Sequence, residues 1–138
     1  TIVDHIIINR RADKLGYAKS CCILGLLMKE DANQLGDLSE AFSWIEKGAN
    51  LGEPSAQSEL GVMYLKGFGC NKNEQKGVEL IQKAADQNVS IAQYQLGTLY
   101  TEGLGVERNS KKAIFWLSCA ASSGLQEANT YLRENYKF

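Results

Sequence analysis

Residues 92–124 read AQYQLGTLYTEGLGVERNSKKAIFWLSCAASSG, and this stretch decides the fold because its pattern recurs along the chain at a constant spacing. A leucine-glycine pair appears every 36 residues, at 24–25, 60–61 and 96–97, and Leu132 keeps the same step. A fixed period of this size is typical of proteins built from stacked supersecondary units. Each unit buries its apolar residues against its neighbours, and the stack presents a long surface to partners.

Two apolar stripes lie within each period. In the first, Ala92, Leu96 and Tyr100 follow one another at steps of four, which places them on one face of a helix. The second stripe has steps of three, one, three and one, which also fit a helical face. Its members are Ala113, Trp116, Leu117, Ala120 and Ala121. We call the two predicted helices of each repeat helix A and helix B.

The glycine that follows the leucine of helix A predicts a close approach between the two helices. A glycine inside a helix costs about 0.5–1 kcal/mol relative to alanine, so three glycines in register imply a compensating gain in packing. Helix A and helix B are therefore expected to pack as an antiparallel pair, with small residues facing large ones.

Turn-forming residues separate the helices. Between helix A and helix B lie glycine pairs at 67/69 and 103/105, followed by Asn73 and Asn109, which are good N-cap residues. Pro54 is expected in the first turn of a helix A. Residues that tolerate a positive φ follow each helix B, namely Gly16, Gly52, Asn88 and Gly124. The glycine pairs predict turns rather than a phosphate-binding loop, because no strand precedes them and no Gly-Lys-Ser/Thr follows.

The composition argues against several classes of function. Fifteen basic and sixteen acidic residues are interspersed, for a net charge of −1, so we expect no binding of nucleic acid. The longest apolar run, residues 21–28, is too short to cross a bilayer, so we expect no membrane insertion. No cluster of His, Cys and carboxylate residues has metal-ligand spacing, and we expect neither a metal nor a cofactor.

The four cysteines do not recur at the period and show no CxxC spacing, so we expect reduced thiols. Cys70 is expected to be a small buried residue, and Cys119 is expected to be exposed. The compartment stays open: a cytoplasmic protein is favoured, and a periplasmic protein whose signal segment has been removed is the alternative.

The chain resembles the Sel-one-like repeat (SLR) family, whose repeat is related to the tetratricopeptide repeat. Two motifs carry the resemblance: Ala-x-Tyr-x-Leu-Gly-x-Leu-Tyr-x-x-Gly-x-Gly-Val at 92–106 and Lys-x-Ala-x-x-Trp-x-x-x-Ala-Ala-x-x-Gly at 111–124; most of both recurs at 56–88. The resemblance implies an all-α fold, a right-handed α-solenoid of stacked antiparallel helix pairs whose helices A line a concave face. It also implies a bacterial adaptor, or an immunity protein that neutralises a secreted toxin.

The period predicts a single repeat domain over the whole chain. Its expected parts are a partial repeat or capping helix at 1–16, repeats at 17–52, 53–88 and 89–124, and a C-terminal capping helix at 125–138. In the first full repeat Asp31 and Asn33 replace the loop glycines, so its turn should have a different shape.

The two ends of the chain depart from the full repeat. Residues 4–16 align with a helix B, with Ile8 in the tryptophan column, so we expect the sequence to start inside an array or with a degenerate cap. In the last segment Ala128, Leu132 and Tyr136 should pack on repeat 89–124. Arg133 stands where the earlier repeats have glycine, which fits a solvated terminal face.

Function is expected at the positions of helix A that vary between repeats, because the shared columns build the core. By analogy with tetratricopeptide repeats, the candidates for binding a partner are Leu26, Lys29, Ser58, Val62, Leu65, Lys66, Tyr94, Thr98, Thr101 and Glu102, with Cys22, Thr130 and Glu134 also facing inward. Leu26, Val62 and Leu65 are apolar where a solvent-facing column tolerates polar residues, which suggests a binding patch. The alternative is that they pack against an adjacent helix or against further repeats.

We therefore predict a non-enzymatic module that binds another protein, either a peptide or a toxin domain, through its concave helix-A face. One alternative is an immunity-type inhibitor that occludes a toxin. An alternative of another class is a thiol enzyme that uses Cys22 with His5, which requires the first helix to fold over the concave face. The oligomeric state stays open.

Overall fold

The computed structural model describes residues 14–35 and 38–136, and within these ranges every regular element is an α-helix. The predicted all-α fold is therefore confirmed. The helices are α2 (Lys14–Leu35), α3 (Leu38–Asn50), α4 (Pro54–Lys66), α5 (Glu74–Asp86), α6 (Ser90–Glu102), α7 (Ser110–Ser122) and α8 (Gln126–Asn135).

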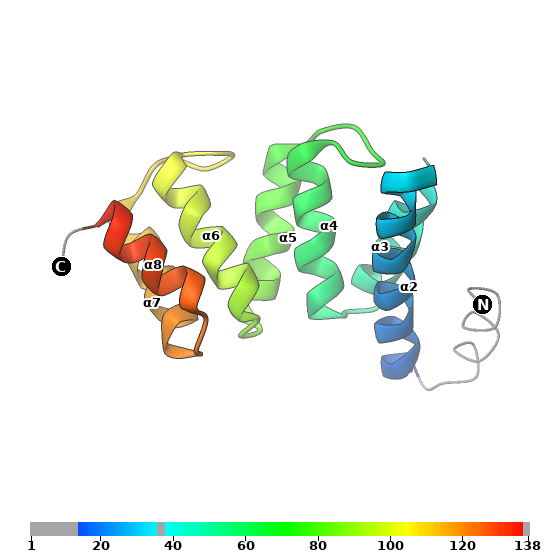
Figure 1. Cartoon of the computed structure of the whole chain (residues 1–138), viewed down its shortest axis with the longest axis horizontal. Helices are drawn as coiled ribbons and strands as arrows, with labels where there is room; N and C mark the ends of the chain where they lie inside the picture. The colour runs from blue at the N-terminus through cyan, green and yellow to red at the C-terminus, as the bar shows by residue number, and fades with distance from the viewer. Residues whose placement is uncertain (1–13, 36–37, 137–138) are drawn as a thin grey trace.

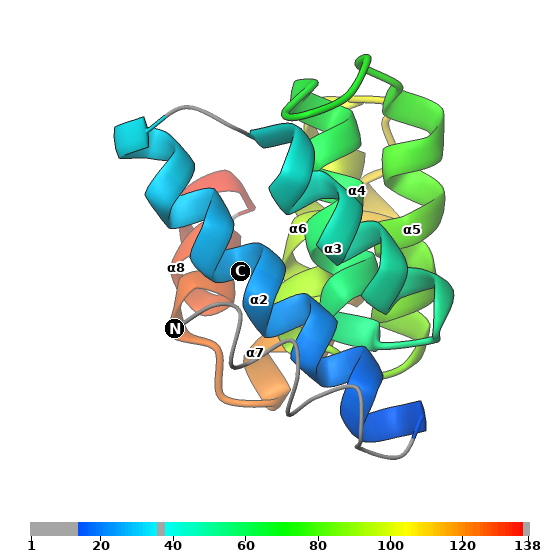
Figure 2. The ribbon, with the colours of Figure 1, turned by 90° about the vertical axis from the view of Figure 1, so that its right-hand side faces the viewer.

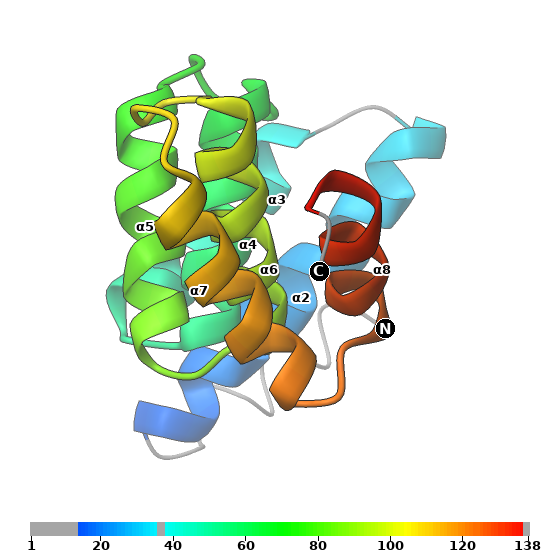
Figure 3. The ribbon, with the colours of Figure 1, turned by 90° about the vertical axis from the view of Figure 1, so that its left-hand side faces the viewer.

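The helices form pairs that stack along the long axis of the molecule (Figure 1). Helices α2, α4, α6 and α8 are the A helices and form one layer, whereas α3, α5 and α7 are the B helices. Each helix packs against the one that follows it in the chain. The end helices α2 and α8 lie farther from α5 than α4 and α6 do (Figures 2 and 3). The layer of A helices is therefore concave on the side that faces away from the B helices. The stack is a short α-solenoid with its A helices on the concave side.

The core consists of the columns that recur in the sequence. The leucine column of helix A and the branched column of helix B are both buried; their members are Leu24, Leu60, Leu96 and Leu132, and Ile45, Ile81 and Leu117. Ala56, Ala92 and Ala128 are fully buried beside them. Each large apolar side chain removed from water contributes about 1.5–3 kcal/mol, so these columns are the main source of stability.

The predicted turn chemistry is confirmed from Gly52 onward. Gly67 and Gly103 end α4 and α6 in the left-handed region, each with φ of +71°. The side-chain oxygens of Asn73 and Asn109 accept hydrogen bonds from the backbone N–H three residues later, at 3.1 Å, and thereby begin α5 and α7. Pro54 lies in the first turn of α4. A positive φ is also found at Gly52, Asn88 and Gly124.

The first repeat differs from the others at both ends of its helix A. Asp31 and Asn33 stand where glycines stop the later A helices, and helix α2 continues through them to Leu35. A turn of different shape was predicted here, but the extension of the helix was not. At its start, the expected turn at Gly16 is wrong: the helix begins at Lys14 and includes this glycine, which helix propensity disfavours but tolerates. His5 and Ile8, together with the predicted partial repeat up to residue 13, lie outside the described residues.

Helix α8 packs on the preceding pair as predicted. Ala128 and Leu132 are buried, and the Tyr136 hydroxyl lies 2.7 Å from the hydroxyl of Thr101 on α6. Arg133 is exposed.

Candidate functional site

The outer surface of the A layer consists of side chains at steps of four, three and four along each A helix, so they share one side of the helix. On α4 these residues are Ser55, Glu59, Val62 and Lys66, and all four are exposed or half-buried. We call this surface the helix-A face. Its other members are Lys19, Ile23 and Leu26 on α2, Ile91, Gln95, Thr98 and Glu102 on α6, and Glu127, Tyr131 and Glu134 on α8. It lies on the concave side of the solenoid.

Five of the ten candidates for binding a partner belong to the helix-A face. Leu26, Lys66 and Glu102 are exposed, and Val62 and Thr98 are half-buried. The side chain of Val62 also packs against the buried cluster that contains Ile81. Contact of these residues with a partner stays a prediction, whereas for Val62 the alternative of packing against an adjacent helix is observed.

Ser58 and Cys22 were expected on the binding surface, and the structure shows that this is wrong. Both side chains are buried, with Ser58 4% and Cys22 3% exposed. The column that they share faces the next A helix rather than solvent. The Ser58 hydroxyl donates a hydrogen bond to Gln95 Oε1 at 2.9 Å, which satisfies a polar group that would otherwise be costly to bury. Both residues therefore join neighbouring helices.

Lys29, Leu65 and Thr101 also take part in contacts between helices. Lys29 forms an ion pair with Glu59. Leu65 lies so close to α5 that a Cβ atom placed on Gly77 would be 2.8 Å from its Cγ. Thr101 is half-buried and donates a hydrogen bond to the backbone oxygen of Gly97 at 3.0 Å, besides its contact with Tyr136. For Leu65 the alternative of packing against an adjacent helix is the correct one.

The prediction missed three apolar residues of the A helices. Ile23, Leu27 and Ile91 are 56%, 41% and 45% exposed. Ile23 and Ile91 lie on the helix-A face in columns that are otherwise mostly polar. An apolar residue at a position where the other repeats carry mostly polar residues is the sequence signal that would have identified both. Leu27 occupies the same repeat position as Met63 and Leu99, which are both buried. The sequence therefore gives no indication that Leu27 is exposed.

A pocket of about 300 Å³ lies at the α8 end of the helix-A face. Tyr94 and Tyr131 meet there edge to face, with ring centroids 5.9 Å apart and an interplanar angle of 87°. Glu127, Glu134 and the predicted inward-facing Thr130 complete much of its wall. Tyr94 is thus half-buried and lines this pocket together with residues of the next A helix.

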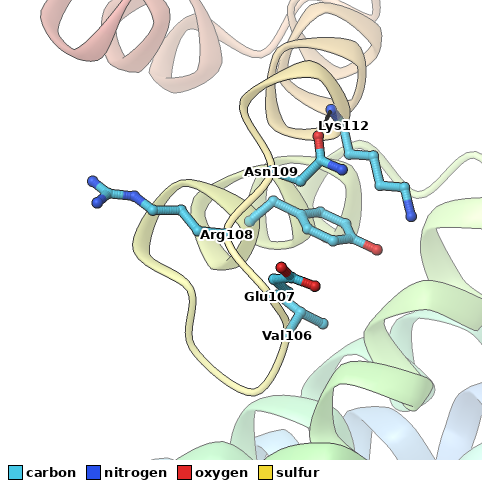
Figure 4. Close-up of a pocket in the computed structure, with 6 residues that line it drawn as sticks. Val106, Glu107, Arg108, Asn109 and Lys112 are labelled. Atoms are coloured by element: carbon cyan, nitrogen blue, oxygen red, sulfur yellow. Dashed lines mark hydrogen bonds between the residues drawn. The ribbon is translucent and has the colours of Figure 1, made fainter.

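A second pocket, of about 350 Å³, lies at the turn between α6 and α7 (Figure 4). Arg108 points away from the other labelled side chains, and its Nε donates to the backbone oxygen of Thr101 at 2.9 Å. Lys112 Nζ lies 5.5 Å from the centre of the Tyr100 ring. The same lysine-tyrosine contact recurs between Lys76 and Tyr64 at 4.8 Å. Because the contact repeats with the period, this pocket belongs to the structure of the repeat.

The cysteine side chains do not form an exposed nucleophilic site. No disulfide joins any of the four, all of which lie in the described part of the chain. Cys70 is half-buried rather than fully buried, and its thiol lies 3.6 Å from the backbone oxygen of Met63. Cys119, expected to be exposed, is also half-buried. Burial, together with the carboxylates of Glu53 and Glu59, raises the pKa of the Cys22 thiol to about 11. A thiol nucleophile needs the opposite shift.

Cys22 is therefore expected to react slowly with iodoacetamide in the folded protein at pH 8. A thiol with a pKa of 11 is ionised about 100-fold less at this pH than one with a pKa of 9, and burial slows the reaction further. The rate should rise about tenfold for each pH unit up to about pH 10. Mass spectrometry of peptides after timed labelling measures it, with the protein unfolded in guanidinium as the control. Labelling of folded Cys22 as fast as in guanidinium would contradict this account.

Residues 14–35 and 38–136 include no helix with the length and apolarity needed to span a membrane. In the same part of the chain, no group of three His, Cys, Asp or Glu side chains is arranged to hold a metal ion.

Comparison with solved structures supports the fold. A Sel1 repeat protein from Oxalobacter formigenes is 32% identical, with a TM-score of 0.72 over 86% of this chain and 51% of that protein. A protective antigen of uropathogenic Escherichia coli strains that displays an SLR fold is 33% identical, with a TM-score of 0.78 over 92% and 28% of the two chains. The chain thus spans about half and about a quarter of these two proteins. Cysteine rich protein B of Helicobacter pylori, 24% identical over 84% of this chain and 89% of its own length, shares the fold with a TM-score of 0.71.

The family model of the Sel1 repeat matches the chain three times, at residues 18–53, 54–89 and 90–125. Each match begins one residue after the corresponding period in the sequence. The matches cover well over half of the chain and include all the repeated columns that form the core. The chain therefore belongs to the Sel1 repeat family.

Proposed function

We propose that this chain is a non-enzymatic adaptor that binds another protein through its helix-A face. The observation that carries the proposal is the placement of exposed apolar side chains. Of the seven large apolar residues that are exposed in the described structure, four lie on the A helices: Ile23, Leu26, Leu27 and Ile91. Ile23, Leu26 and Ile91 belong to the helix-A face, and apolar residues gathered on one face indicate an interaction surface.

The family and the architecture support the same conclusion. Sel1 repeat proteins generally mediate protein–protein interactions. In this chain the repeated columns are occupied by packing, so the varying residues of the concave side are those left for recognition. An inhibitor of a secreted toxin would use the same face, and the identity of the bound protein separates it from an adaptor.

A matched pair of variants tests the proposal. Ile23→Ser/Leu26→Ser changes the helix-A face, whereas Phe115→Ser removes an apolar side chain of similar exposure from α7, on the other layer. Each tagged protein is used to capture partners from a lysate of the organism that encodes it, with identification by mass spectrometry. We expect a protein that the unchanged chain and Phe115→Ser both retain, and that Ile23→Ser/Leu26→Ser retains at least tenfold less.

This comparison requires that the three proteins have equal melting temperatures. Equal values are expected because Ile23, Leu26 and Phe115 are all exposed. Retention of every captured protein by Ile23→Ser/Leu26→Ser would contradict binding through the helix-A face. Loss of the same partner in Phe115→Ser would place the interaction on the opposite layer.

A further inference from the structure

We infer that the partner segment bound on the helix-A face carries apolar residues at its α2 end and a lysine or arginine at its α8 end. The cationic side chain lies in the pocket between Tyr94, Tyr131, Glu127 and Glu134. The inference rests on the proposed function, because it names the chemistry of the segment that this face binds.

The helix-A face changes character along the solenoid. At one end α2 presents the exposed apolar residues Ile23 and Leu26. At the other end Glu102, Glu127 and Glu134 are exposed, and no lysine or arginine of α6 or α8 belongs to the face. A segment that lies along the face therefore meets an apolar surface first and a negative one last. Complementary charge sets the direction in which such a segment binds.

The carboxylates at the two ends differ in their partners. Glu59, near the α2 end, is paired with Lys29 of the neighbouring helix. The ion pairs found within residues 14–35 and 38–136 do not involve Glu127 or Glu134. The pocket that these two residues share with Tyr94 and Tyr131 contains no basic side chain in its wall. Its negative charge is thus left for a ligand from outside the described chain.

The tyrosines make the pocket suitable for a cation rather than for a polar side chain in general. An edge-to-face pair leaves part of a ring face accessible, and such a face attracts the cationic group of a lysine or arginine electrostatically. Burial raises the pKa of the Tyr131 hydroxyl; a hydrogen bond with Thr101 lowers it, and the carboxylate of Glu102 raises it. The volume of about 300 Å³ accommodates a single long side chain.

A random dodecapeptide library displayed on phage supplies the probes. Peptides selected against the full chain are synthesised with a fluorescent label, and each is paired with a copy in which lysine is replaced by norleucine and arginine by citrulline. Their dissociation constants are measured by fluorescence anisotropy against the unchanged chain, Glu127→Gln/Glu134→Gln and Ile23→Ser/Leu26→Ser. The charge-matched control is Glu40→Gln/Glu79→Gln, which neutralises two exposed carboxylates of the B helices.

We expect the selected peptides to combine apolar residues with a basic residue near one end. The neutral copies and Glu127→Gln/Glu134→Gln should each weaken binding at least tenfold, and the control should change it less than twofold. Peptides that lose affinity with Ile23→Ser/Leu26→Ser but not with Glu127→Gln/Glu134→Gln would overturn the cation site and leave the proposed function intact. Failure to select any peptide sensitive to either pair of changes would overturn both.

Discussion

Replacement of Leu96 by alanine is expected to lower the free energy of unfolding by about 2–5 kcal/mol. Leu96 is fully buried on α6, in a cluster with Ile81, Ala85 and Leu99. Truncation removes apolar contacts and leaves a cavity that the two adjoining helix pairs can fill only in part. Because the cluster joins neighbouring repeats, the loss is expected in one cooperative transition. Urea unfolding followed by circular dichroism measures it.

Leu104→Ala is the matched control. This leucine lies in the turn after α6 and is 37% exposed, so the same chemical change should cost less than about 1 kcal/mol. A loss of equal size at both positions would show that the leucine column is not the main core of the repeat.

The second large effect is expected for Gly61→Ala, which should destabilise the protein by about 1–3 kcal/mol. Alanine is the better helix former by about 1 kcal/mol, so propensity alone predicts a gain. The structure predicts a loss because a Cβ atom at this position would lie 2.7 Å from the backbone oxygen of Gly77 and 2.7 Å from Ile81 Cγ1. A backbone atom cannot move aside without separating α4 from α5. Thermal and urea unfolding of the variant test this prediction.

Gly97→Ala on the next repeat is the informative comparison. Its Cβ atom would lie 2.5 Å from the Cγ of Leu117, whereas the nearest backbone atom, the oxygen of Ala113, is 3.2 Å away. A leucine side chain can change its rotamer, so the cost should be smaller than at Gly61. Higher stability of Gly61→Ala than of the unchanged chain would refute the close approach as the reason for the glycine.

The repeat predicted the core and the turns because these features depend on interactions that recur within every unit. Leu96 is buried for the same reason as Leu60, so a constant spacing identifies both. The caps at Asn73 and Asn109 depend on a backbone N–H only three residues away, which the local sequence determines. A different turn near Asp31 was also predictable, because the glycine that ends the later A helices is missing there. The length by which α2 extends was not predictable.

The composition of the helix-A face was predicted less well. The exposure of Leu26, Lys66 and Glu102 agrees with the sequence, because an exposed position on one side of a helix follows from the helical period. Ser58 and Cys22 were misplaced because their column faces the next A helix. The hydroxyl of the buried Ser58 is satisfied by Gln95, which belongs to the following A helix and not to the same repeat.

The sequence by itself thus determined the fold class, the pairing of helices within each repeat, the core columns and the turns, since all of these arise from contacts within one period or between identical columns. Only the tertiary structure decided which of the remaining columns of helix A are open to a partner. That choice depends on the rotation between successive helix pairs, which no single repeat encodes. The stacking of successive A helices brings Tyr94 of α6 against Tyr131 of α8 and buries Ser58 against Gln95, and so it decides which part of the A layer is left for the binding that is proposed.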